Sequence, residues 1–220
     1  MTRAGERGQV VLPVGGPGEA PPAEAVERAA AVLRDGGVVA LPTDTVYGLA
    51  VLPAVSGATD GLFRLKRRAA DVPVAVLCAG AGQALALARP EAVGAEVRRL
   101  ADRLWPGPLT LVLPRRPGLG YALGEPATTI GLRCPDHRLV RALAGAAGPL
   151  ATTSANLHGQ PTPATAAGVA DLFGPALALV LDGGPCAAPP STVVAADPAG
   201  WRVLREGPLT LADVEAAATA

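Results

Sequence analysis

Hydroxyl and carboxylate side chains follow a short apolar run near residue 41, and they could hold a small polar molecule. The run Val38–Leu41 is typical of a buried strand, and the segment 42–48, Pro-Thr-Asp-Thr-Val-Tyr-Gly, comes directly after it. In open α/β sheets, small ligands bind at strand ends. The same residues also form turns in which threonine hydroxyls cap their own backbone. This stretch alone leaves both interpretations open.

Three further segments place neutral polar side chains beside apolar runs. They are Thr110 after Trp105–Pro108, the run Thr152–Asn156, and Ser191-Thr192. Each could equally be a set of turn residues. Four cations, however, lie at element ends next to these segments: Lys66, Arg68, Arg133 and Arg205. Lysine and arginine facing hydroxyls and backbone N–H groups make an anion site, so the pattern predicts an anionic ligand.

Lys66 is the single lysine among 19 basic residues, in a chain rich in alanine, glycine, proline and arginine. In such a composition a surface lysine readily drifts to arginine, so the remaining one is expected where a compact ammonium is needed. Its neighbour Arg67 is instead expected to lie on the surface, with its charge solvated. Arg205 could likewise form an exposed ion pair with Glu206.

Several common chemistries are disfavoured by the motifs. The chain has neither a Walker A pattern around Lys66 nor a GxGxxG motif that opens a helix. No serine or cysteine in an elbow pattern accompanies His137 or His158, which disfavours a Ser-His-Asp hydrolase. Carboxylates are scattered, so a metal held by protein ligands alone has little support. The three cysteines are far apart and fit small core residues or inert thiols.

Hydrophobic periodicity and turn residues predict alternating helices and strands around these segments. Ser56 and Thr210 are expected to cap helices. The expected helices span 21–35, 57–68, 83–88, 92–104, 137–147 and 164–173, with one more after Thr210. The expected strands span 38–41, 47–52, 72–78, 109–113, 128–133, 150–153, 176–181, 191–195 and 201–204. This irregular alternation predicts an α/β fold, a twisted mixed β-sheet with helices packed on it.

Length and composition agree with one globular domain. The chain has 220 residues, of which 50% are hydrophobic and 17% charged, and no apolar run approaches the roughly 18 residues of a membrane span. We expect a flexible segment at residues 1–17, a single domain at 18–218, no signal peptide and a cytoplasmic location. The formal net charge is zero, so any contact with RNA would have to come from a local patch.

Seven segments follow one another in the order found in a known family. They resemble the signatures of the YrdC-like family, the L-threonylcarbamoyladenylate synthases of the TsaC type, over about residues 24–211. The matching segments are Pro42–Gly48, Lys66-Arg67-Arg68, Trp105–Thr110, Thr129–Arg133 with Asp136-His137, Thr153–Asn156, Ser191–Val193 and Leu204–Gly207. The chain stops after the catalytic-type domain, which resembles the short form without an extra C-terminal domain.

Two positions depart from the family pattern. Ala69 stands where a proline often follows the Lys-x-Arg motif, and Leu77 stands where some members carry a histidine. One contact to threonine is therefore expected to be absent or made differently.

The resemblance implies a YrdC-like fold with a concave ligand cleft. It also implies a reaction that joins L-threonine, bicarbonate or CO2, and ATP into threonylcarbamoyl-AMP and pyrophosphate, for a partner complex that modifies tRNA. Lys66 and Arg68 are then the candidate catalytic residues, and Mg²⁺ is expected to arrive on the ATP phosphates rather than in a protein cage. The implied ATP site is Lys66, Arg68, Thr129, Asn156 and Arg205; the implied threonine site is Thr43, Arg133, Ser154 and Ser191.

The family resemblance also assigns supporting roles and leaves alternatives. Asp44 and Thr45 are expected to shape the loop, Tyr47 to pack behind it, and the loop 157–163 or 182–190 to close over the site. A carbamoyl-transfer domain of hydrogenase maturation proteins (HypF) has a similar fold, but it normally sits in a much longer chain. A non-catalytic RNA-binding module is the other alternative, which the 3% aromatic content disfavours.

Overall fold

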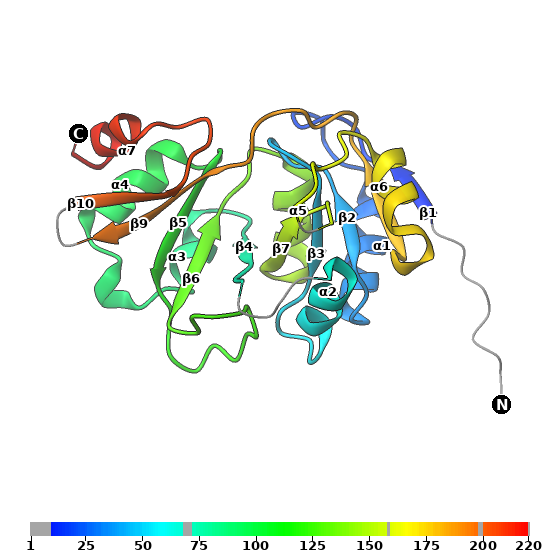
Figure 1. Ribbon diagram of the computed structural model, residues 1–220, viewed down its shortest axis with the longest axis horizontal. Helices are drawn as coiled ribbons and strands as arrows, with labels where there is room; N and C mark the ends of the chain where they lie inside the picture. Colours follow the sequence, from blue (N-terminus) through cyan, green and yellow to red (C-terminus); the bar gives the residue numbers. More distant parts are fainter. Residues whose placement is uncertain (1–9, 68–71, 158, 198–199, 220) are drawn as a thin grey trace.

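A single mixed sheet runs through the molecule (Figure 1). The computed structural model describes residues 10–67, 72–157, 159–197 and 200–219, and within these ranges ten strands have the order β1-β8-β2-β3-β7-β4-β6-β5-β9-β10. The strands are β1 (Val10–Pro13), β2 (Val39–Leu41), β3 (Gly48–Val51), β4 (Ala75–Leu77), β5 (Leu109–Pro114), β6 (Thr129–Arg133), β7 (Leu150–Ser154), β8 (Leu179–Asp182), β9 (Thr192–Asp197) and β10 (Gly200–Arg205). The sheet contains both parallel pairs, such as β4/β6, and antiparallel pairs, such as β3/β7, which confirms the predicted mixed sheet.

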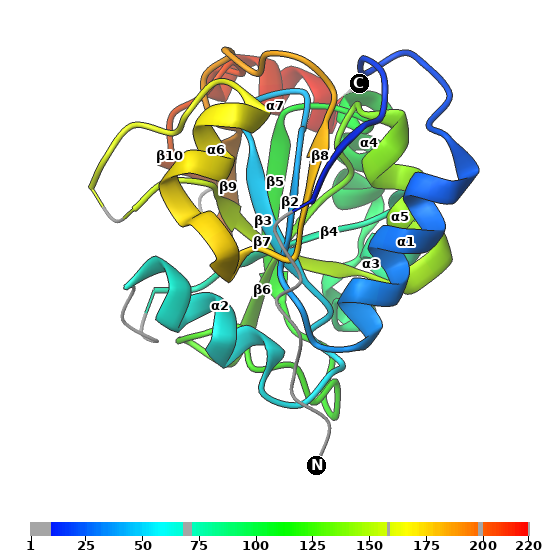
Figure 2. The same cartoon turned by 90° about the vertical axis from the view of Figure 1, so that its right-hand side faces the viewer.

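Helices cover both faces of the half of the sheet around β8, β2 and β3 (Figure 2). The helices are α1 (Ala23–Arg34), α2 (Ala58–Lys66), α3 (Ala81–Leu85), α4 (Ala95–Leu104), α5 (Arg138–Ala147), α6 (Ala166–Phe173) and α7 (Leu211–Thr219), with 3-10 turns at Pro90–Ala92 and Gly174–Ala176. Val39 and Leu41 pack in one apolar cluster with α1 and α5, whereas Ala40 packs in the other with α2 and α6. This alternation follows from the pleat, in which successive side chains point to opposite faces.

The other half of the sheet, around β6, β5 and β9, uses its two faces differently. Leu109, Leu111 and Leu113 of β5 are fully buried in the cluster that includes α4 and α7. The alternate residues Thr110 and Val112 line a cavity instead. Helices therefore cover one face here, and the opposite face is left for a ligand.

Most elements occur where the sequence predicts them, but their ends differ by a few residues. The strand expected at 72–78 is shorter, spanning Ala75–Leu77. Ser56 does not cap α2, because the cap position is Gly57 in a left-handed conformation without a side-chain hydrogen bond. Thr210 does cap α7, since its hydroxyl accepts from the N–H of Asp213 at 3.2 Å.

The assignment of residues 1–17 to a flexible segment is wrong for its second half. Residues Val10–Pro13 form β1, which pairs in parallel with β8, and the N–H of Val14 donates to the Asp182 carbonyl at 2.8 Å. Residues 1–9 lie outside the described ranges. Of the helices that the structure describes, none combines the length and the apolar character needed to cross a membrane.

Candidate functional site

A cavity of about 610 Å³ lies over the uncovered face of the sheet. Its floor is made of alternate residues on neighbouring strands, as the pleat requires. These are Ala75 and Leu77 of β4, Thr129, Gly131 and Arg133 of β6, and Thr110 and Val112 of β5. Its walls come from the turn after β2, the segment after β7 and the loop before β9. This volume lies within the usual range for a small-molecule site, and the cavity is the concave cleft that the family resemblance implied.

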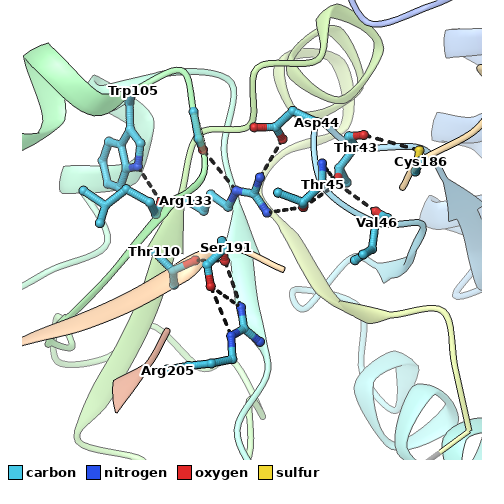
Figure 3. Close-up of polar contacts among 12 residues, drawn as sticks. Thr43, Asp44, Thr45, Val46, Trp105, Thr110, Arg133, Cys186, Ser191 and Arg205 are labelled. Atoms are coloured by element: carbon cyan, nitrogen blue, oxygen red, sulfur yellow. Dashed lines mark hydrogen bonds and ion pairs between the residues drawn. The ribbon is translucent and has the colours of Figure 1, made fainter. Parts of the chain in front are cut away.

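Arg133 is the buried cation of this cavity, and three protein groups hold its guanidinium (Figure 3). Its Nη2 donates to Asp44 Oδ1 at 2.6 Å, its Nη1 to Thr45 Oγ1 at 2.9 Å and its Nε to the Gly107 carbonyl at 3.1 Å. Burial lowers the pKa of Arg133, and the nearby Asp44 carboxylate acts in the opposite direction. A guanidinium has five N–H groups, so two remain without a partner among the described residues.

Gly107 brings the Trp105–Pro108 turn against this arginine. A Cβ added at Gly107 would lie 2.6 Å from the Leu104 carbonyl oxygen, which only glycine avoids. The Gly107 N–H donates to the Cys134 carbonyl at 2.9 Å, and the Trp105 indole N–H donates to the Leu109 carbonyl at 2.8 Å. The turn thus carries a fixed carbonyl that orients Arg133.

The hydroxyl of Thr43 is used within its own turn. It donates to the Val46 carbonyl at 2.7 Å, accepts from the N–H of Thr45 at 3.1 Å and lies 3.0 Å from Thr45 Oγ1. Because its proton goes to Val46, the Thr45 hydroxyl must donate to it, and no hydrogen-bonding capacity is left. Thr43 therefore lines the cavity as a self-capped turn residue, which confirms the turn interpretation, while its role in ligand binding stays a prediction.

The loop between β8 and β9 is bonded to this turn. Tyr47 is fully buried, and its hydroxyl donates to the Gly184 carbonyl at 2.8 Å. The Cys186 thiol donates to the Thr43 carbonyl at 3.4 Å, and the Cys186 N–H donates to Ala164 at 2.8 Å. Burial raises the pKa of both Tyr47 and Cys186, so both groups stay protonated donors at neutral pH.

Thr110, Ser191 and Arg205 form a second polar group in the cavity lining (Figure 3). Arg205 donates to the Ser191 carbonyl through Nε at 3.1 Å and through Nη2 at 2.8 Å, and Nη2 also donates to Ser191 Oγ at 2.9 Å. The hydroxyls of Thr110 and Ser191 are 2.9 Å apart. Only one of their two protons lies in that bond, so the pair offers one O–H donor to a ligand.

Lys66 lies behind the cavity, and its lining does not include this residue. It is 2% exposed at the end of α2. Its ammonium donates to Thr153 Oγ1 at 3.2 Å, to the Ser154 carbonyl and to Asn156 Oδ1 at 3.0 Å. The Ser154 hydroxyl donates to the same Asn156 oxygen at 2.6 Å. The lone lysine therefore organises the segment after β7, and its positive charge lies directly behind residues that do line the cavity.

The cavity brings together seven of the nine residues that the family resemblance assigned to ligand binding: Thr43, Thr129, Arg133, Ser154, Asn156, Ser191 and Arg205. Arg68 and Ala69 lie outside the described residues. Leu77 lines the floor at the position where some family members carry a histidine. His137 occupies the cap position of α5, as expected for a helix-start residue, and is 1% exposed.

Several lining residues were not among the proposed site residues. They include Gln160 and Thr162 after β7, Cys186 and Ala187 before β9, and the apolar residues Val74, Leu123 and Ile130. The alternation of β5 and β6 could have indicated Val112 and Gly131, because they lie two residues from Thr110 and Arg133. The loop residues have no comparable periodicity.

The charges around the cavity have one sign. Arg133 and Arg205 are in the lining, whereas no carboxylate is found among its described residues. Within the described part of the chain, no group of three or more His, Cys, Asp or Glu side chains could hold a metal ion. The arrangement therefore suits an anionic ligand with several acceptor oxygens.

The sequence also matches a known family over most of its length. The profile Sua5_yciO_yrdC, described as "Telomere recombination", matches residues 31–207. A putative threonylcarbamoyl-AMP synthase of Mycobacterium leprae is 36% identical over 87% of this chain and 87% of its own length. The chain belongs to the Sua5/YciO/YrdC family.

Other family members are similar over a shorter share of their own length. The threonylcarbamoyl-AMP synthase of Bacillus subtilis is 38% identical over 87% of this chain but only 56% of its own length. The crystal structure of Pyrococcus abyssi Sua5 complexed with L-threonine has a TM-score of 0.86 and 33% identity, covering 94% of this chain and 60% of that one. The chain thus spans about 60% of these two longer relatives and nearly all of the mycobacterial one.

Proposed function

We propose that this chain is an L-threonylcarbamoyladenylate synthase, which forms threonylcarbamoyl-AMP and pyrophosphate from L-threonine, bicarbonate or CO2, and ATP. The observation that carries this proposal is the guanidinium of Arg133, held by Asp44 in a cavity whose lining includes several hydroxyl side chains, with two N–H groups left over among the described residues. Two parallel N–H groups are the partner that a carboxylate prefers. The names of the relatives support the same reaction.

In this proposal L-threonine lies against Arg133. Its carboxylate accepts from the two remaining N–H groups, and the hydroxyl pair of Thr110 and Ser191 donates one hydrogen bond to it. Ser154 lines the same cavity, and Thr43 lines it with a hydroxyl that is bonded within its own turn. Leu77, the neighbour of Arg133 in the β4/β6 pairing, supplies an apolar contact where a histidine would offer a polar one.

ATP is proposed to lie beside threonine, near Thr129, Asn156 and Arg205. Arg205 supplies a cation for the phosphates, and Lys66 contributes its field from behind Asn156 while it holds that side chain in place. Arg68 completes the set proposed from the sequence. The described residues of the cavity lining include no carboxylate. We propose that Mg²⁺ enters on the ATP phosphates, and none of the residue roles proposed above depends on this ion.

The chemistry consists mainly of positioning and charge stabilisation. The neutral threonine amine attacks the carbon of CO2. An N–C bond forms, the electron pair of one C–O π bond moves to oxygen, and the nitrogen loses a proton to solvent, which gives a carbamate. A carbamate oxygen then attacks the α-phosphorus of ATP, and the bond to pyrophosphate breaks. Arg133 and Arg205 in the cavity lining offset the negative charge of the two anions that are brought together. Loop 157–163 or 182–190 would exclude water from these labile intermediates.

The product is proposed to pass to a threonylcarbamoyl transferase complex that modifies tRNA. A cytoplasmic location, where ATP and tRNA are both present, is part of the same proposal.

Pyrophosphate release with each substrate omitted in turn tests this function. Release should require ATP, L-threonine and bicarbonate together, and the product should carry a carbon label from bicarbonate. Release that continues without threonine would exclude this function and would favour an enzyme of the HypF type. Absence of turnover together with tight tRNA binding would favour a non-catalytic RNA-binding module.

A further inference from the structure

A second cavity lies outside the proposed active site, and we call it the arginine hollow. Its volume is about 360 Å³, and it is lined by Arg89, Arg115, Arg116, the segment 117–121, Ala127 and Thr128. Arg89 follows α3, whereas the other residues belong to the loop between β5 and β6. Three guanidinium groups therefore gather at one place on a chain whose formal net charge is zero.

No acidic group neutralises these three arginines within the described ranges. The ion pairs found there join Asp44 to Arg133 and Asp136 to Arg141, and no carboxylate is among the described residues that line the hollow. Glu125 is on the same loop, but its carboxylate accepts from the Ala127 N–H at 2.9 Å and so caps the loop backbone. The arginine hollow is therefore a local positive patch that suits an anionic partner.

Backbone hydrogen bonds fix the positions of the three arginines. The N–H of Arg89 donates to Pro114 at 2.8 Å, that of Arg115 to Thr128 at 2.8 Å, and that of Arg116 to Leu87 at 3.0 Å. The Arg115 guanidinium also donates to the Tyr121 carbonyl. Because the chain is tied down at each arginine, little backbone ordering is needed when a ligand binds.

Tyr121 places an aromatic ring beside these cations. It is half-buried, and burial raises the pKa of its phenol, with a smaller contribution from Cys78, while Arg116 and Arg115 act in the opposite direction. Tyr121 lines the same hollow as Arg115 and Arg116. Sites for single-stranded nucleic acids often combine an aromatic ring with cations in this way.

We propose that the arginine hollow binds backbone phosphates of RNA. Planar guanidinium groups form paired hydrogen bonds with phosphate oxygens, and several of them side by side match successive phosphates of one strand. Free pyrophosphate offers the same chemistry and is the other source of phosphate groups. The site is separate from the threonine and ATP cavity, so this inference does not depend on the proposed reaction.

The loop that forms the arginine hollow also walls the main cavity. Leu123 and Gly124 of this loop line the main cavity, and Thr129, which follows Thr128 of the hollow, lies on its floor. The N–H of Val74, another lining residue, donates to the Leu123 carbonyl at 2.9 Å. An RNA strand in the hollow would therefore touch the backbone that shapes the substrate site.

Fluorescence anisotropy with a labelled tRNA transcript tests the proposal on the full chain. The double variant Arg89→Gln/Arg116→Gln is compared with the matched control Arg28→Gln/Arg98→Gln, which removes two exposed helical arginines outside both cavities. The variant Arg89→Gln/Arg116→Gln, called the hollow variant below, should raise the Kd for tRNA at least tenfold. It should also reduce the slope of log K against log salt by about 1.5. The control should change the Kd less than twofold. Pyrophosphate release without tRNA should be unchanged in both.

A second arm separates the two sources of phosphate. Titration calorimetry with pyrophosphate should give the same stoichiometry for the wild type and the hollow variant if RNA is the occupant. Loss of one bound pyrophosphate per chain in the variant, with tRNA binding unchanged, would assign the hollow to a small phosphate anion and overturn the RNA proposal. Equal tRNA affinity for both double variants without any change in pyrophosphate binding would overturn phosphate binding altogether.

Discussion

Asp44 orients Arg133 without lining the cavity itself. Replacing Asp44 with Asn keeps the shape of the side chain but leaves a buried guanidinium without its counter-charge. Removing one partner of a buried pair costs about 3–5 kcal/mol, so Asp44→Asn should lower the free energy of unfolding by about 3 kcal/mol and raise the KM for threonine. Urea denaturation and steady-state kinetics measure the two effects.

An exposed carboxylate provides the control for Asp44. Asp60 lies in the first turn of α2 and is exposed, so Asp60→Asn should change the free energy of unfolding by less than about 0.5 kcal/mol. If Asp44→Asn and Asp60→Asn lower the free energy of unfolding by the same amount, the Asp44–Arg133 ion pair stabilises the fold no more than an exposed carboxylate does.

His137 gives the stability of the protein a predictable dependence on pH. Its two ring nitrogens are buried without a hydrogen-bond partner among the described residues, and burial lowers its pKa from 6.5 although the Asp44 and Asp136 carboxylates oppose this shift. Below pH 6.5 the unfolded chain therefore binds a proton that the folded chain does not. Stability should fall as the pH drops through this window, by up to about 1.4 kcal/mol per pH unit.

The variant His137→Leu isolates this contribution. It removes the titrating group and the two unpaired nitrogens, so its free energy of unfolding should depend less on pH between 7.5 and 5.5 than that of the wild type. Urea denaturation at three pH values measures the difference. Parallel curves for the two proteins would mean that His137 titrates alike in the folded and unfolded chains.

Residue types predicted the composition of the site better than they predicted the hydrogen bonds within it. Thr43, Arg133, Ser191 and Arg205 do line one cavity. The saturation of the Thr43 hydroxyl and the position of Lys66 behind the cavity depend on geometry that no spacing in the sequence encodes. A lone lysine indicates that an ammonium is needed, but it does not tell which oxygens surround it.

Among the elements, the loop between β8 and β9 depends on Tyr47 for its position. Tyr47→Phe removes the hydroxyl that donates to Gly184 and should destabilise the protein by about 1 kcal/mol. Amide hydrogen exchange at residues 184–188 should become faster, because the first half of the loop loses an anchor. The control Tyr121→Phe removes a hydroxyl from a half-buried ring elsewhere and should leave exchange in this loop unchanged.

A larger residue at Gly131 of β6, on the cavity floor, should leave the fold stable but weaken ligand binding. A Cβ there would lie 3.5 Å from Thr110 Cγ2 and 3.8 Å from Ala75, which is ordinary contact. Val favours a strand, so Gly131→Val should change the free energy of unfolding by no more than about 1 kcal/mol. Its two methyl groups would enter the cavity, and binding of threonine and ATP should weaken at least tenfold, with Gly131→Ala intermediate in calorimetry. Unchanged affinities would place the ligands away from the floor.

Element types followed from local periodicity, whereas element ends and long-range pairing did not. The Ala164–Phe173 pattern predicted α6, which begins at Ala166 after a Thr165 cap. Strand β1 was missed because Val10–Pro13 is only four residues long and its partner β8 lies far along the chain. Such a segment gains its strand conformation from tertiary pairing, which a short apolar run does not encode.

At the scale of the whole molecule, the two proposed substrates rest on different parts of the sheet. Threonine is assigned to Arg133 on β6 with the turn after β2, and the ATP phosphates to Arg205 at the end of β10. Arg133 and Arg205 are 72 residues apart in the sequence (205 minus 133). They come together because the sheet has the order β6-β5-β9-β10, in which β9 pairs in parallel with β5. Each ligand should therefore stabilise the folded chain through its own cation.

Thermal unfolding of variants can separate these two contributions. A ligand present at 100 times its Kd stabilises the folded state by about 2.7 kcal/mol, which is about 5–10 °C in Tm for a chain of this size. Arg133→Lys should abolish the shift caused by threonine and keep the shift caused by ATP, because an ammonium cannot replace a paired guanidinium donor. Arg205→Gln should do the reverse, each variant being compared with its own ligand-free Tm. If Arg133→Lys retains the full threonine shift, the carboxylate of threonine lies elsewhere in the cavity.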